Sequence, residues 1–281
     1  MGRRAVVLAG GSFAASAWES GLVAGLAEAG LDLRQADLFI GTSAGARVAL
    51  HLANGTEPRQ LFDLQKVPLG GGPGGPSGPR MSFDSVRAEC AEAKAAGGGL
   101  EAILTRFGAI ALKHAPAADL EARRKTMAAQ LPVQAWPEKP VSVVALNART
   151  GQRRAFTKES GVSLIDVMLA TTASFGAAPV ELDGQPYFDG GYHSSNNADL
   201  AAGFDEVFVL SLRAPPFALA LVPLSESVEA LQRTGAKVTV LQPDEASEAA
   251  VNSGRPGDPS IRGPIAEAAY QQGKRFVRWL S

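Results

Sequence analysis

The sequence predicts an α/β fold in which a mostly parallel β-sheet is covered by helices on both faces. Two observations predict it. Short apolar runs rich in β-branched residues recur along the 281 residues, and helix-forming stretches separate them. Strands that are apolar along their whole length and alternate with helices are typical of parallel sheets buried on both faces. The expected strands cover 5–9, 36–40, 141–146, 206–212 and 237–242.

Helices are expected between and after these strands. The last one is amphipathic, with its charged residues apart from its apolar ones, which favours a packed terminal helix with solvated cations over a membrane anchor. The expected helices cover 17–29, 44–53, 83–95, 120–130, 164–171, 225–234 and 265–280.

The chain is expected to form a single domain over residues 1–281. The stretch 68–80 is too rich in Gly and Pro to form helix or sheet, and we interpret it as a surface excursion rather than a linker. The segment after it, about 82–130, is mostly helical, and the strands resume only at Val141. We therefore expect a helical cap at 82–130 on the same domain, in a position where it can border an acyl-chain pocket.

The composition excludes several classes of function. The chain is 46% hydrophobic and 20% charged with a net charge of −1, so it lacks the basic balance of a nucleic-acid-binding domain. The single cysteine, Cys90, excludes an intrachain disulfide and a multi-cysteine metal site. The first apolar run breaks at Gly10 and Gly11, as a first strand would and a signal peptide would not. No run is long enough for a transmembrane helix. We expect a cytoplasmic protein that can contact a membrane surface transiently.

The pentapeptide Gly41-Thr42-Ser43-Ala44-Gly45 lies between an expected strand and an expected helix. A G-x-S-x-G sequence in this setting is typical of a nucleophile elbow, in which the serine sits on a strained strand-to-helix turn. The helix N-terminus there favours developing negative charge. An ordinary strand–turn–helix connection is the alternative interpretation. The pattern makes Ser43 the candidate nucleophile.

A second glycine turn, Gly10-Gly11-Ser12-Phe13, follows the first expected strand. It lacks the third glycine of a dinucleotide-binding turn and the Lys-Ser/Thr pair of a P-loop. Its backbone N–H groups can instead form an oxyanion hole, where each donor stabilises the transition state by roughly 3 kcal/mol. A tight βα turn without catalytic function would use the same glycines.

The string Asp189-Gly190-Gly191 follows an expected hairpin, 180–187, whose turn is Asp-Gly. A carboxylate beside two glycines can approach other backbone closely, although a turn aspartate that caps local N–H groups would also fit. The three histidines, His51, His114 and His193, do not have the chain setting of a triad base. Only His193 remains a secondary candidate for that role. The simplest arrangement is therefore a dyad in which Asp189 is the base for Ser43.

The three strings together resemble the patatin-like phospholipase family, most closely its bacterial members. The resemblance implies a three-layer α/β/α sandwich, with Ser43 as the acyl-accepting nucleophile and Asp189 as the general base. It also implies an oxyanion hole from backbone N–H groups of the Gly10–Phe13 turn, supported by Gly41 and Gly45 at the elbow and by Gly190 and Gly191 after the base. It calls for no metal and no organic cofactor.

The glycine turn departs from the family pattern, because Ala9, Ser12, Ala14 and Ala15 stand where glycines and a basic residue are usual. A Cβ at Ser12 would strain the turn if its φ must be positive.

The leading hypothesis is a serine acyl hydrolase acting on lipid or other carboxylic esters through an acyl-enzyme. Alternatives are an acyltransferase with the same dyad, and a catalytically weak lipid-binding or interaction module. A Ser-Asp-His hydrolase ranks last because it needs a suitable late histidine.

Overall fold

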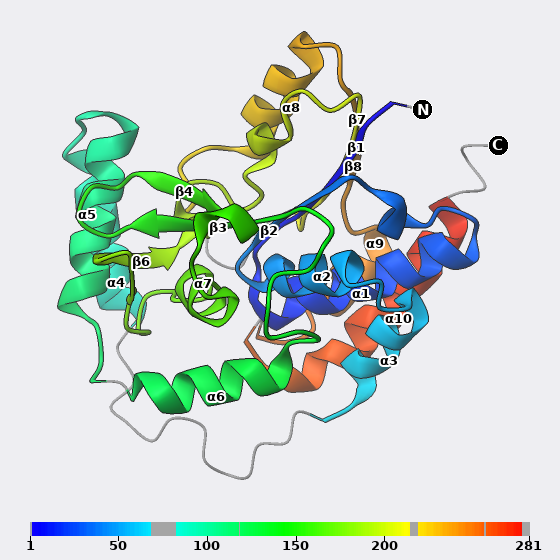
Figure 1. Ribbon diagram of the computed structural model, residues 1–281, viewed down its shortest axis with the longest axis horizontal. Helices are drawn as coiled ribbons and strands as arrows, with labels where there is room; N and C mark the ends of the chain where they lie inside the picture. The colour runs from blue at the N-terminus through cyan, green and yellow to red at the C-terminus, as the bar shows by residue number, and fades with distance from the viewer. Residues whose placement is uncertain (1, 69–82, 118, 214–218, 256, 277–281) are drawn as a thin grey trace.

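The structure is a computed structural model that describes residues 2–68, 83–117, 119–213, 219–255 and 257–276. One sheet carries the strand order β5-β6-β3-β2-β1-β7-β8, and β4 pairs with β3 (Figure 1). The pairs from β3 through β2, β1 and β7 to β8 are parallel, whereas β4, β5 and β6 add antiparallel pairs. The strands are β1 (Arg4–Leu8), β2 (Leu38–Thr42), β3 (Val141–Asn147), β4 (Arg153–Phe156), β5 (Val180–Leu182), β6 (Gln185–Asp189), β7 (Glu206–Leu210) and β8 (Lys237–Leu241).

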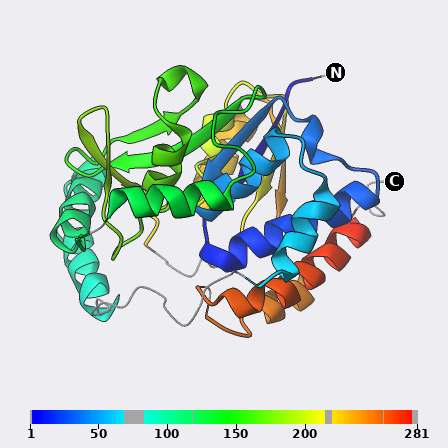
Figure 2. The ribbon, with the colours of Figure 1, turned by 60° about the horizontal axis from the view of Figure 1, so that its bottom comes forward.

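The helices occupy both faces of this sheet. In Figure 1, α8 lies on the opposite side of the strands from α1, α2 and α10. Turned by 60°, the molecule shows α10 running beside α1 and α3 (Figure 2). The described α-helices are α1 (Ser12–Glu28), α2 (Ala44–Ala53), α3 (Pro58–Lys66), α4 (Phe83–Ala95), α5 (Gly99–Lys113), α6 (Leu120–Gln130), α7 (Leu164–Thr171), α8 (Leu224–Arg233), α9 (Glu245–Val251) and α10 (Arg262–Phe276).

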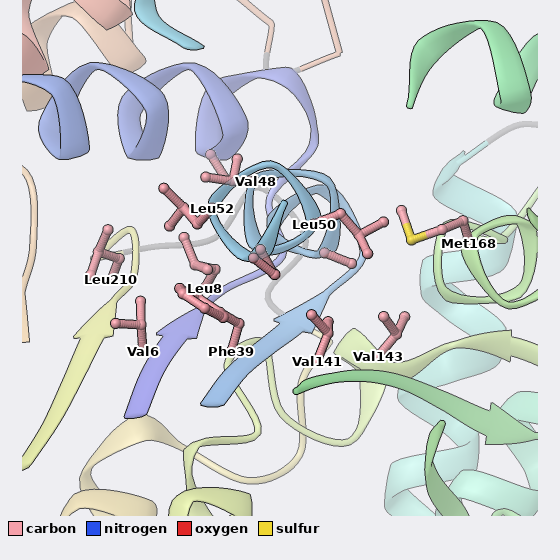
Figure 3. Packing of buried hydrophobic residues seen from close by; sticks show 14 of the residues in the cluster. Val6, Leu8, Phe39, Val48, Leu50, Leu52, Val141, Val143, Met168 and Leu210 are labelled. Atoms are coloured by element: carbon pink, nitrogen blue, oxygen red, sulfur yellow. The ribbon is translucent and has the colours of Figure 1, made fainter. Parts of the chain in front are cut away.

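Successive residues of each central strand point into different layers of the core. Val6 and Leu8 of β1 pack with helices α1 and α2, while Ala5 and Val7 pack on the face covered by α8. Figure 3 shows Val48 and Leu52 of α2 above Leu8 and Phe39 of the sheet. Both faces of the strands are apolar for this reason. The expected α/β fold with helices on both sides of a mostly parallel sheet is confirmed.

The five expected strands and the hairpin at 180–187 are present. At the hairpin turn Asp183 has φ 51° and Gly184 has φ 71°, as a two-residue turn with two positive φ values requires. Three helices and one strand were not predicted individually, although one of these helices lies in the segment 82–130 that was expected to be mostly helical. They are α3, α5, α9 and β4.

The start of the first helix differs from expectation. Helix α1 begins at Ser12 rather than Ala17, so the glycine turn passes directly into the helix. The segment expected to be a cap carries α4, α5 and α6. Most of the expected surface excursion at 68–80, together with the last residues of the expected terminal helix, lies outside the described residues.

The register of β3 brings distant parts of the chain together. Thr42, the last residue of β2, pairs with Val144, and Asp189, the last residue of β6, pairs with Ala145. Consecutive residues of one strand therefore hold the ends of β2 and β6 next to each other. Ser43 follows Thr42 directly, so this register places the candidate nucleophile beside the candidate base.

Candidate active site

Ser43 adopts the backbone conformation of a nucleophile elbow. It lies between β2 and α2 with φ 51° and ψ −119°, in a region that a non-glycine residue rarely occupies. The flanking glycines allow the surrounding backbone to pass. A Cβ on Gly41 would lie 2.4 Å from the Cα of Ala46, and one on Gly45 would lie 2.3 Å from the carbonyl oxygen of Leu8. Neither position can accept a side chain without moving backbone.

The hydroxyl of Ser43 donates a 2.8 Å hydrogen bond to Oδ2 of Asp189. Ser43 is half-buried, and Asp189 is 5% exposed. The structure thus brings the two sequence-predicted residues into direct contact, with the distance that proton transfer from a nucleophile to a base requires.

The carboxylate of Asp189 has three hydrogen-bond donors. Oδ2 also accepts from the Ser174 hydroxyl at 2.9 Å, and Oδ1 accepts from the Gly191 N–H at 2.8 Å. Burial raises the pKa of Asp189 above its ordinary value of 3.8, and these donors offset part of that effect. The geometry fits both interpretations of Asp189, because one oxygen accepts from the local Gly191 N–H and the other accepts from the Ser43 hydroxyl.

Thr171, at the end of α7, fixes the backbone of the elbow. Its hydroxyl accepts from the Ser43 N–H at 2.9 Å and donates to the carbonyl of Val144 at 2.6 Å. Sequence reasoning missed both Thr171 and Ser174, since neither belongs to a recognised motif. Their position shortly before the hairpin that delivers Asp189 is the only signal the sequence offers.

A buried asparagine, Asn197, hydrogen-bonds to the end of β2 and to the residue that follows β6. Asn197 has φ 53°, and its Nδ2 donates to the Thr42 hydroxyl at 3.0 Å and to the Ser194 carbonyl at 2.8 Å. The same atom lies 3.5 Å from the carbonyl of Gly190. The Asn197 amide therefore links the residue before Ser43 to the residue after Asp189.

The Gly10–Phe13 turn borders the same cavity as Ser43. The N–H of Gly10 donates to the Ser195 carbonyl at 2.7 Å, so that group is engaged within the fold. Gly11 precedes α1, and Ser12 has φ 60° as its first residue. The N–H groups of a first helical turn lack carbonyl partners within their own helix. Within the described part of the chain, Gly11, Ser12 and Phe13 are therefore the members of the turn whose N–H groups have no acceptor.

Among the three histidines, none hydrogen-bonds to Ser43 or Asp189. His114 bonds to Glu89, and His51 bonds to Thr56 at 3.1 Å. His51 lines the cavity, but burial and the nearby charge of Arg47 lower its pKa to about 4. Burial and Arg153 likewise lower the pKa of His193 to about 4. Both rings are therefore neutral at physiological pH, and neither takes part in the hydrogen bond between Ser43 and Asp189.

A cavity of about 1000 Å³ opens above Ser43 and Asp189. Its apolar wall comes from α2 and α3 and includes Val48, Leu61 and Leu64, while α6 borders it with Thr126 and Ala129. A cavity of this size can hold a substrate with an acyl chain. The arrangement places a serine hydroxyl, a carboxylate in contact with it and the backbone of the Gly10–Phe13 turn around one partly apolar cavity.

Two further properties concern the described part of the chain. No cluster of three or more His, Cys, Asp or Glu side chains is arranged to hold a metal ion there. No helix within the same residues combines the length and hydropathy needed to cross a membrane.

The chain was compared with protein families, curated proteins and solved structures, and only solved structures match it. No protein-family model and no curated protein matches the chain. The type III effector protein ExoU shares 13% identity and a TM-score of 0.44, over 99% of this chain and 53% of ExoU. VipD from Legionella pneumophila shares 12% identity and a TM-score of 0.47, over 99% of this chain and 67% of VipD. Full-length ExoU of Pseudomonas aeruginosa, in its complex with full-length SpcU, shares 14% identity and a TM-score of 0.34, over 97% of this chain and 52% of that one.

This chain thus spans about half the length of ExoU. At such low identities and TM-scores the similarity carries no information about chemistry. The function proposed below rests on the geometry of the site itself.

Proposed function

We propose that the protein is a serine acyl hydrolase of the patatin-like type, acting on lipid or other carboxylic esters. The observation that carries the proposal is the 2.8 Å hydrogen bond from Ser43 to the buried carboxylate of Asp189, on an elbow with the strained φ of 51°. Strain of this kind persists only where the surrounding structure imposes it, and it is concentrated at functional sites.

In the first step the Oγ of Ser43 attacks the ester carbonyl carbon, and Asp189 accepts the hydroxyl proton. A bond forms between Oγ and the acyl carbon, and the carbonyl oxygen becomes negatively charged. The N–H groups of Gly11, Ser12 and Phe13 are the proposed donors to this oxygen. The bond between the acyl carbon and the alkoxy oxygen then breaks, and the proton held by Asp189 passes to the leaving alcohol.

In the second step a water molecule takes the place of the alcohol. Asp189 removes one proton from the water, whose oxygen attacks the acyl carbon of the acyl-enzyme. The bond to Oγ breaks, Ser43 regains its proton, and a carboxylic acid is released. An acyltransferase would differ only in the acceptor that enters at this point, and added alcohols would reveal it by forming new esters.

The test is hydrolysis of p-nitrophenyl esters from acetate to palmitate by wild type, Ser43→Ala and Asp189→Asn. The proposal predicts turnover by wild type and loss of activity to background in Ser43→Ala. The matched control is Ser211→Ala, which removes a buried hydroxyl that bonds to the Leu212 carbonyl outside this cavity. Turnover by Ser43→Ala equal to that of wild type would reject the proposal. A protein that turns over no ester in the series would favour the binding module.

A further inference from the structure

Three cationic side chains line the cavity that contains Ser43: Arg47 of α2, Lys125 of α6 and Arg262 of α10. Among the described lining residues, Asp189 is the sole carboxylate. The electrostatic balance of this space is therefore positive, in a chain whose net charge is −1. Clefts lined by one sign of charge concentrate ligands of the opposite sign.

None of the three cations forms an ion pair within the described part of the chain. Arg47 donates from one terminal nitrogen to the side-chain oxygen of Gln130. Arg262 donates to the Gln65 side chain and to the carbonyls of Leu64 and Val67. All of these acceptors are uncharged, so the positive charge of each guanidinium is not neutralised.

Two adjacent cations of α6, Arg124 and Lys125, differ in whether they are paired with a carboxylate. Arg124, directly before Lys125 in α6, makes a two-pronged contact with Asp166, at 2.7 Å and 3.0 Å. Arg124 does not line the cavity, whereas Lys125 does. Arg124, which does not line the cavity, is thus paired with a carboxylate, whereas Lys125, which does, has no ion pair within the described residues.

Arg47 lies in the first turn of α2, directly after the elbow, and its side chain borders the same cavity as Ser43. Arg262 is only 6% exposed. Burial lowers the pKa of Arg47, and the charge of Arg262 lowers it further, which means that the two guanidinium groups are close enough to repel each other. Holding like charges together in a buried space is unfavourable unless an anion enters between them.

We infer that the Arg47, Lys125 and Arg262 side chains form an anion subsite, which binds a phosphate or carboxylate group carried by the ester substrate while Ser43 attacks its carbonyl. This inference rests on the proposed hydrolase function and adds a substrate class to it. The substrate then has an apolar chain against Val48, Leu61 and Leu64 and a fixed negative charge against the three cations. Guanidinium groups suit such anions because their donors match two oxygens at once.

A binding experiment tests the subsite without any catalysis. Hexyl phosphate and hexanol are titrated into Ser43→Ala by calorimetry, then into Ser43→Ala combined with Arg47→Gln, Arg47→Lys or Lys125→Gln. The subsite predicts that hexyl phosphate binds more tightly than hexanol, that Arg47→Gln weakens it about tenfold or more, and that Arg47→Lys restores part of the loss. Arg59→Gln is the matched control, because it removes an exposed cation from α3 outside the cavity.

Lys125 keeps the test decisive if a variant of Arg47 fails to fold, since Lys125 is exposed on α6 and its replacement does not disturb the core. Inorganic phosphate distinguishes the source of the anion. Equal affinity for phosphate and hexyl phosphate would show that a free anion, rather than a substrate group, is recognised, and would overturn the inference. Binding of hexyl phosphate that is no tighter than that of hexanol would overturn it as well.

Kinetics with matched esters separates this inference from the proposed function. Two pairs are compared, dihexanoyl phosphatidic acid with dihexanoylglycerol, and p-nitrophenyl hydrogen glutarate with p-nitrophenyl pentanoate. A preference for the anionic member, lost in Arg47→Gln, supports the subsite, and the pair that shows it tells whether the charge lies on the alcohol or the acyl side. Hydrolysis of neutral and anionic esters at equal kcat/KM would refute the subsite and leave the hydrolase standing. Binding that depends on Arg47 without hydrolysis of any ester would support the subsite and refute the hydrolase function.

Discussion

The Ser43 hydroxyl and the Asp189 carboxylate are 146 residues apart in sequence and joined by a 2.8 Å hydrogen bond. The register of β3 creates this contact, since Thr42 pairs with Val144 and Asp189 pairs with the next residue, Ala145. The contact between Ser43 and Asp189 is therefore held by strand pairing within the sheet, which is a rigid support. A site built on strand ends keeps its geometry better than one carried on loops.

The environment of Asp189 predicts how activity depends on pH. A base works only when deprotonated, and burial raises the pKa of this carboxyl above 3.8. We expect kcat/KM to fall as the pH is lowered through a pKa above that value. Asp189→Asn should lower kcat by about 10²- to 10⁴-fold and remove this acid limb. A profile with an unchanged acid limb in Asp189→Asn would assign the titration to another group.

Ser174→Ala tests the second donor to Asp189. The Ser174 hydroxyl stabilises the charged carboxylate, so its loss should raise the pKa of Asp189 further and move the acid limb of kcat/KM to higher pH. On the alkaline plateau we expect a loss of no more than about tenfold, the value of one hydrogen bond. Ser211→Ala should leave the acid limb in place. A shift to lower pH in Ser174→Ala would contradict this account of the carboxylate.

Ser12 tests whether the glycine turn acts through its backbone. Its φ of 60° is costly for a residue with a Cβ, and more so for a β-branched one. Ser12→Gly should retain activity within a few-fold and leave the free energy of unfolding unchanged or up to about 1 kcal/mol higher. Ser12→Val should lower both. Denaturant unfolding and ester hydrolysis measure the two effects. Loss of activity in a fully folded Ser12→Gly would mean that the side chain itself takes part.

A buried acid in α1 predicts a second pH effect, this one on stability. Glu19 is 1% exposed, and burial raises its pKa well above 4.5, an effect that the backbone of Ala9 offsets only in part. The unfolded chain therefore loses this proton at lower pH than the folded protein does. From about pH 4.5 up to the folded pKa, the free energy of unfolding should fall by about 1.4 kcal/mol per pH unit from this group.

Glu19→Gln should remove that loss and stabilise the protein at neutral pH. Glu28→Gln is the matched control on the same helix, because Lys274 and Tyr270 lower the pKa of Glu28 and its charge is favourable in the folded state. It should not stabilise the protein. Thermal unfolding from pH 5 to 8 compares the two. A stabilisation of equal size in both variants would show that Glu19 is not the titrating group.

The sequence predicted the central elements of the fold because their signals are local. The strand residues from Ala5 to Leu8 are apolar on both faces, and the Gly41–Gly45 elbow and the Asp183-Gly184 turn are defined by short-range conformational requirements. The supporting contacts depend on the assembled fold. Nothing near Thr171 in the sequence indicates that its hydroxyl meets the Ser43 N–H, or that Gly10 donates to the Ser195 carbonyl. Arg47 was closest to being predictable, since it lies in the first turn of the helix that follows Ser43, whereas Arg262 reaches the cavity only through the packing of α10.

The most direct test of the central claim is covalent labelling with an alkyl fluorophosphonate, followed by intact mass measurement and peptide mapping. The account predicts one adduct per chain on the peptide that contains Ser43, none in Ser43→Ala, and much slower labelling in Asp189→Asn. An adduct on another residue, or labelling of Asp189→Asn at the wild-type rate, would show that Ser43 and Asp189 do not act as nucleophile and base.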